Sequence, residues 1–256
     1  MSTPRIAMIL YTVRQEAARD LPGTLKRVRD VGFEYVQWSG MPQMPAEDVR
    51  KALDDAGLQA IGGHCDVTAF ERDFDREVAF WKTIGTSNVG PGGMMGDCMA
   101  DLDGWLAGAR RLDAVGAQLK AEGMRLFYHN HDHEFTRFAG DDRYKFDILY
   151  AETDPTHLYA EIDVAWVYVG GEDPAAYLRN YAGRCPLIHI KDVQGKRKAD
   201  GSVRFMPVGQ GDLDWPAVFQ AARDAEVEWL IYEQDTCEGD VFDAARASYE
   251  FMKAHA

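Results

Sequence analysis

The sequence predicts one (β/α)₈ TIM barrel domain that spans residues 1–256. Short runs rich in apolar and β-favouring residues alternate with longer amphipathic stretches, and eight such alternations occur along the chain. No all-β block interrupts them, as expected for a parallel sheet covered by helices. The length of 256 residues also suits a single barrel, which commonly has about 250 residues. An open doubly wound sheet is the alternative way to cover parallel strands.

The predicted elements follow one another in strict alternation. The strands are expected at residues 6–10, 35–38, 58–64, 87–90, 124–129, 158–163, 187–191 and 228–233. The helices are expected at residues 21–31, 46–56, 74–84, 101–122, 146–151, 174–181, 215–225 and 244–253. Gly32 and Gly57 end two of these helices, and Asp214 precedes Pro216 in the first turn of a third.

The longest irregular segment is residues 193–212, after the seventh strand. Loops of this length are uncommon unless they cover a site or are disordered. The segment ends in Gly209-Gln210-Gly211, at a place where many barrels bind phosphate. We expect a tight turn there, because a capped helix follows directly.

Composition and charge restrict the partners of the protein. Hydrophobic residues make up 46% of the chain, which is enough for a packed core. The formal charge of −14 would repel phosphate backbones and anionic lipid, so neither nucleic acid nor a membrane is expected as a partner. The N-terminus does not have the pattern of a secretory signal, and the four cysteines are scattered. A cytoplasmic protein is expected.

The densest chemical motif is Phe-Tyr-His-Asn-His-Asp-His-Glu at residues 127–134, directly after the fifth strand. It contains three of the seven histidines. Imidazoles beside carboxylates at a strand end suit metal binding or proton transfer near neutral pH. The next three predicted strands also end in His, Asp or Glu, and strand ends of a barrel converge at the rim where active sites lie.

These strand ends supply the predicted site. Side chains alternate along a strand, so each of three strands carries two polar residues on one face: His129 with His131, Glu161 with Asp163, and His189 with Lys191. The predicted metal ligands are His129, Asp163, His189 and Glu233. Such a mixed nitrogen and oxygen set suits Mn²⁺, the favoured ion, but also Co²⁺, Zn²⁺ or Mg²⁺. The general acid or base is expected among His131, Glu161, Lys191 and Glu233.

Three further residues are predicted to contact the substrate. Trp38, His64 and Trp166 lie at or just after strand ends, where aromatic rings can stack on a sugar and an imidazole can donate to a hydroxyl. Several predicted site residues also have an ordinary structural explanation: a solvated loop for the histidine-rich motif, a cap for Asp163, a core histidine for His189, the exposed end of a strand for Glu233, and rim packing for the tryptophans. The recurrence on four adjacent strands favours a site.

The motifs and their order resemble the xylose-isomerase-like family of sugar isomerases and epimerases, which also includes inosose dehydratases and is structurally related to endonuclease IV. The resemblance covers nearly the whole chain and rests on residues 10–14, 31–36, 128–134, 161–164, 189–192, 208–211 and 232–235. It implies a Glu, Asp, His, Glu metal set in which both glutamates exchange protons. Asp163, His189 and Glu233 match this pattern, whereas His129 replaces the first glutamate.

The resemblance implies a divalent-metal-dependent sugar isomerase or epimerase. It would act on a sugar, keto-sugar or cyclitol by proton abstraction next to a carbonyl, through an enediolate. Loss of the first glutamate points toward the alternative, a dehydratase or other β-eliminating lyase, or toward an isomerisation that uses a different base. A second alternative is a non-catalytic sugar-binding or partner-dependent barrel, and a homo-oligomer is compatible with any of these. Phosphodiester hydrolysis is disfavoured because the chain lacks a basic stripe for DNA.

Overall fold

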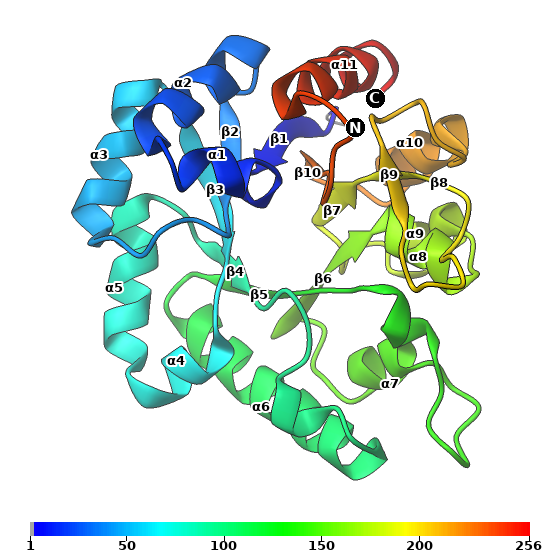
Figure 1. Ribbon diagram of the computed structural model, residues 1–256. Helices are drawn as coiled ribbons and strands as arrows, with labels where there is room; N and C mark the ends of the chain where they lie inside the picture. The colour runs from blue at the N-terminus through cyan, green and yellow to red at the C-terminus, as the bar shows by residue number, and fades with distance from the viewer. Residues whose placement is uncertain (1–2) are drawn as a thin grey trace.

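The computed structural model describes residues 3–256, and within them it confirms the predicted barrel (Figure 1). Eight parallel strands close in the order β1-β10-β7-β6-β5-β4-β3-β2. Because β1 pairs with both β10 and β2, the open doubly wound sheet is excluded. The strands are β1 (Arg5–Ile9), β2 (Tyr35–Trp38), β3 (Gln59–His64), β4 (Asn88–Gly90), β5 (Arg125–His129), β6 (Leu158–Asp163), β7 (Leu187–Ile190) and β10 (Trp229–Tyr232).

The helices surround this barrel (Figure 1). The helices that match the prediction are α2 (Leu21–Val31), α3 (Ala46–Ala56), α5 (Phe74–Ile84), α6 (Leu102–Ala121), α7 (Lys145–Ala151), α9 (Pro174–Asn180), α10 (Trp215–Asp224) and α11 (Val241–His255). Short helices that the sequence did not predict follow several strands: η1 (Leu10–Val13), α1 (Arg14–Ala17), α4 (Val67–Arg72), η2 (Gly96–Cys98), η3 (Asp132–Phe135) and α8 (Val164–Gly170). Among residues 3–256, no helix is both long and apolar enough to cross a bilayer.

The barrel interior is divided into an apolar half and a polar half. The apolar part consists of Ala7, Ile9, Ile61, Phe127, Leu187, Trp229 and Ile231. Its floor is closed by Arg125, whose two Nη atoms bind the Glu228 carboxylate at 2.7 and 2.8 Å. Because inward positions recur every second residue, the next inward side chains toward the mouth include Gln37, Glu161 and His189, all fully buried.

The irregular segment after β7 contains an antiparallel hairpin that the sequence did not predict, formed by β8 (Asp192–Gln194) and β9 (Arg204–Met206). Its Phe205 ring lies 5.6 Å from the Trp166 ring, so the segment covers part of the barrel mouth. The expected turn at Gly209-Gln210-Gly211 is confirmed. The backbone N–H groups of Gly209 and Gly211 and the indole N–H of Trp215 all donate to Oδ2 of Asp192, each at 2.9 Å.

Candidate metal centre

Four neighbouring strands bring the four predicted metal ligands together. His129 ends β5, Asp163 ends β6, His189 lies on β7 and Glu233 follows β10. In the sheet, Asp163 pairs directly with His189. One donor atom from each of the four side chains lies within 4.8 Å of the others, and all four residues are buried. The arrangement predicted from the strand ends is therefore present, and metal binding by it is taken up below as a proposal.

Lys191 lies among the carboxylates of this cluster. Its Nζ is 3.0 Å from Asp163 Oδ2, 2.9 Å from Glu233 Oε2 and 3.1 Å from Asp235 Oδ1. Burial alone would lower the pKa of Lys191, but the negative charges of Asp163, Asp235 and Glu233 raise it well above its usual value. These carboxylates are therefore arranged around a positive charge, which the Lys191 ammonium supplies.

His189 connects the four predicted metal ligands to the residues that lie deeper in the barrel, because each of its two ring nitrogens makes a hydrogen bond. Nδ1 donates to Glu233 Oε2 at 2.7 Å, and Nε2 donates to Gln37 Oε1 at 2.9 Å. Burial lowers the pKa of His189, but the charges of Glu161 and Glu233 outweigh this and raise it to about 10. His189 is therefore an imidazolium at neutral pH, and a metal ion bound to it would replace a proton.

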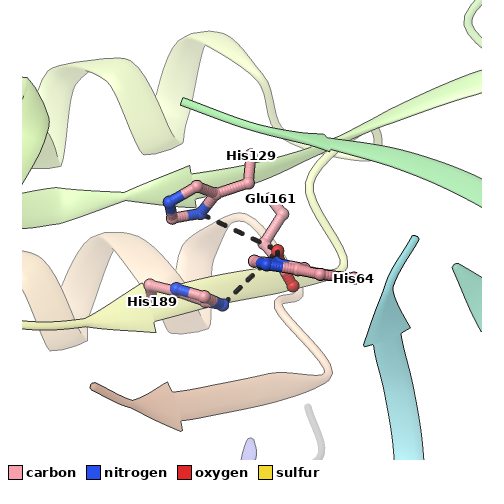
Figure 2. A group of neighbouring side chains, drawn as sticks. All are labelled: His64, His129, Glu161 and His189. Atoms are coloured by element: carbon pink, nitrogen blue, oxygen red, sulfur yellow. Dashed lines mark hydrogen bonds and ion pairs between the residues drawn. The ribbon is translucent and has the colours of Figure 1, made fainter. Parts of the chain in front are cut away.

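Glu161 forms the deeper layer, shown in Figure 2 with the histidines around it. Its Oε1 accepts from Gln37 Nε2 at 2.5 Å, and its Oε2 accepts from His64 Nε2 at 2.8 Å. Burial raises the pKa of Glu161, but His189 and His64 lower it to about 2. Glu161 is therefore a carboxylate among hydrogen-bonding imidazoles, a setting that suits it to binding a cation, and its role as a general base stays a prediction.

His129 is a neutral, unsatisfied imidazole. Burial lowers its pKa well below the usual value, with a further contribution from His189, His131 and His64. Its buried Nδ1 has no hydrogen-bond partner among the described residues, and Glu161 Oε2 is 3.8 Å away. Buried polar atoms are almost always paired, so this nitrogen has the state and setting of a metal ligand.

Asp163 has one oxygen available for a ligand. Its Oδ1 accepts the backbone N–H of Trp166 at 3.0 Å and thereby caps helix α8. The Asp163 backbone N–H donates to the Asn130 side chain at 3.0 Å. Oδ2 is thus the oxygen that faces Lys191. The two imidazoles and two carboxylates of this set together fit a divalent transition-metal ion.

In the histidine-rich segment, residues 127–134, Glu134 has a structural role next to the site. Glu134 is fully buried and accepts from the Tyr128 hydroxyl at 2.6 Å and from the His131 backbone N–H at 2.8 Å. These bonds hold the turn of η3 and direct the His131 ring toward Trp166, at 5.4 Å between centroids. Burial and the nearby Lys191 charge lower the pKa of His131. His131 is therefore a neutral imidazole near the mouth.

The predicted substrate contacts lie at two different places. Trp38 and His64 line a cleft of about 1060 Å³ over β2 and β3, which also includes Met41, Met44, Arg72 and Arg76. Trp166 lies on the other side of the mouth, packed against Phe205, and only 8% of it is exposed. The cleft reaches the cluster through His64, which binds Glu161.

Sequence reasoning missed two residues of this site. Gln37 joins Glu161 to His189 by two hydrogen bonds. Asp235 contacts Lys191, and burial raises its pKa to about 7. The alternation rule could have identified both: Gln37 is a polar residue at an inward position of β2, and Asp235 lies two residues after Glu233, on the same side of the chain.

Comparison with known proteins identifies a family and several relatives of this chain. A sequence model of the family described as xylose isomerase-like TIM barrel matches residues 25–255. An inosose dehydratase from Clostridium tetani is 29% identical over 157 residues, which cover 56% of this chain and 49% of the relative. The rhizopine catabolism protein MocC of Rhizobium meliloti is 22% identical over 82% of this chain and 73% of its own. The chain spans about half the length of the inosose dehydratases it matches.

Solved structures agree at the level of the fold. A sugar phosphate isomerase/epimerase from Parabacteroides distasonis superposes with a TM-score of 0.79 and 23% identity, covering 99% of this chain and 95% of the other. An L-ribulose 3-epimerase gives a TM-score of 0.72 and 17% identity, covering 98% and 94%.

Proposed function

Because the chain belongs to the xylose isomerase-like TIM barrel family, we propose that it is a divalent-metal-dependent enzyme that removes a proton next to the carbonyl of a keto-sugar or keto-cyclitol. One observation carries this proposal: His129, Asp163, His189 and Glu233 place their donor atoms within 4.8 Å of one another at the barrel mouth. Mn²⁺ is the favoured ion, with Co²⁺, Zn²⁺ and Mg²⁺ as alternatives. The ion would polarise the ketone and acidify the adjacent C–H bond.

The residues around the cluster supply the proton transfers. Lys191 is charged and donates toward Glu233 and Asp235, so it can stabilise a developing oxyanion or protonate a leaving hydroxyl. His131 is neutral and near the mouth, so it can accept a proton. Glu233 is held ionised: burial raises its pKa, but Lys191 and His189 lower it well below the usual value. His131, Lys191 and Glu233 therefore carry the proposed acid–base chemistry.

Elimination of water is the outcome that we propose. Epimerisation requires a proton acceptor on one face of the carbon and a donor on the other, a task that the resemblance assigns to two glutamates. Here the first of these positions is His129, which is buried and neutral and therefore a poor proton donor. Elimination requires loss of one α-proton and departure of a β-hydroxyl as water. The inosose dehydratases among the relatives support this choice.

Isomerisation or epimerisation is the second candidate, supported by the likeness to a sugar phosphate isomerase/epimerase and an L-ribulose 3-epimerase. Incubating the Mn²⁺-loaded protein with an inosose and with ketohexoses in deuterated water separates the two. Dehydration gives a product that has lost one water, whereas isomerisation gives a product of unchanged formula that contains solvent deuterium. Absence of both mass loss and deuterium uptake with Mn²⁺ and with Co²⁺ would refute the proposed function.

A further inference from the structure

We propose that a second position for a transition-metal ion lies deeper in the barrel than the first, between His64, Glu161, Nδ1 of His129 and Nε2 of His189. The donor atoms of these four residues also lie within 4.8 Å of one another. Glu161 is two residues before Asp163 on the same strand and the same face, which places this position below the first. It goes beyond the proposed function and does not depend on it.

The distances around Glu161 match the dimensions of a metal site. Three imidazole nitrogens surround its Oε2: Nε2 of His64 at 2.8 Å, Nε2 of His189 at 3.4 Å and Nδ1 of His129 at 3.8 Å. Ligand atoms held 2.0–2.1 Å from a tetrahedral zinc ion are about 3.4 Å apart. The three nitrogen-to-oxygen distances, 2.8, 3.4 and 3.8 Å, are distributed around this value, so the donor atoms have about the spacing of zinc ligands. Figure 2 shows the rings of His64, His129 and His189 gathered around the carboxylate.

A second, independent observation comes from His129. Its Nδ1 is buried, has no hydrogen-bond partner among the residues described, and faces Glu161. The residue as a whole is 3% exposed. At 3.8 Å the two atoms are too far apart for a hydrogen bond, so both would gain a partner from a cation between them. An ion at this position would pair both groups.

The surrounding contacts support the same assignment. The Gln37 amide donates to Oε1 of Glu161 and accepts from Nε2 of His189, so it fixes the orientation of two of the four donors. Outer contacts of this kind are typical of protein metal sites. His189 presents Nε2 to the deeper position and Nδ1 to Glu233 in the first. The two positions therefore lie at opposite edges of one imidazole ring.

The donor set predicts which ion binds. Three imidazoles and one carboxylate favour Zn²⁺ or Co²⁺ over Mg²⁺ or Ca²⁺, because nitrogen ligands suit the later transition metals. The first position has two carboxylates and is richer in oxygen, which suits Mn²⁺ better. The first equivalent of Zn²⁺ should therefore enter the deeper position.

The test uses zinc alone as the probe. The Asp163→Asn/Glu233→Gln variant removes both carboxylates of the first position, and it should still bind one Zn²⁺ per chain in calorimetry. Adding Glu161→Gln or His64→Asn should weaken this binding by more than about 100-fold. His157→Asn, at a half-buried histidine outside the cluster, is the matched control and should have no effect. Zinc binding that is lost in the double variant, or unchanged by Glu161→Gln, would overturn the proposal.

A spectroscopic measurement covers the case in which the double variant does not fold. X-ray absorption of the wild-type protein with one equivalent of Zn²⁺ should show three imidazoles around the ion. Two or fewer would place the ion elsewhere and overturn the proposal. These readouts do not involve turnover, so a wild-type protein that binds zinc as expected but processes no keto-sugar would count against the proposed function alone.

Discussion

Nζ of Lys191 lies 3.0 Å from Oδ2 of Asp163, the oxygen that remains after the other one has capped helix α8. The buried ammonium and a divalent ion would compete for the same carboxylates. Lys191→Met should therefore bind Mn²⁺ roughly 10-fold more tightly in calorimetry, because a nearby positive charge is removed. Turnover should fall at the same time. Lys196→Met, at an exposed lysine, should leave the Mn²⁺ affinity unchanged, and an unchanged affinity in Lys191→Met would argue against the ligand assignment.

Two substitutions at Asp163 separate its role as the cap of helix α8 from its proposed role as a metal ligand. Asparagine caps helices as well as aspartate does, whereas alanine does not, and loss of a cap costs about 1 kcal/mol. Both Asp163→Asn and Asp163→Ala lose the charge near Lys191 and should bind Mn²⁺ much more weakly. Only the alanine variant should also lose the cap, so urea unfolding should show it about 1 kcal/mol less stable than the asparagine variant. Equal stabilities would show that the bond to Trp166 contributes nothing.

The floor of the barrel gives a pH-dependent prediction. The hydrogen bonds from Arg125 lower the pKa of Glu228 in the folded protein, against the raising effect of burial. A carboxyl with a lowered folded pKa contributes stability above its unfolded pKa, about 4.3, and this is lost as the pH falls through the folded value. Both side chains are partly exposed, so the contribution is at most about 1 kcal/mol.

The measurement compares Glu228→Gln with the wild type in urea at several pH values. The glutamine variant should be less stable at pH 7, and the difference should shrink as the pH approaches about 3. A difference that grows toward acid pH would contradict this account.

Asp192 should be important for stability but not for chemistry. Its buried carboxylate accepts from Gly209, Gly211 and Trp215 and so holds the end of the hairpin segment. Asp192→Ala leaves these donors unpaired and should lower the free energy of unfolding by about 3 kcal/mol. Asp200→Ala, at an exposed turn of the same segment, should cost much less. A loss of metal affinity in Asp192→Ala without loss of stability would place Asp192 in the site instead.

The sequence was sufficient for the barrel and for the first layer of the site, because both depend on periodicity. Strands alternate with helices, and inward residues recur every second position, so His129, Asp163, His189 and Glu233 could be placed together. Most of the unpredicted helices and both hairpin strands have only three to six residues, which is too few to show a period.

The roles of the deeper residues, Glu161 and Gln37, were harder to predict from the sequence. Whether Glu161 acts as a base or as a binding group depends on its pKa, which His64 and His189 set from other strands. The part played by Gln37 depends on two bonds to residues more than a hundred positions away. Such tertiary effects cannot be derived from local pattern.

The Gln37 side chain has a mechanical consequence. Strand β2 lies opposite β6 in the closed ring, so the bond from Gln37 to Glu161 braces the barrel across its diameter. Trp38, the next residue, lines the wide cleft. The strand that supplies part of the wall of this cleft is therefore also the strand that orients Glu161 and His189, through a single glutamine side chain.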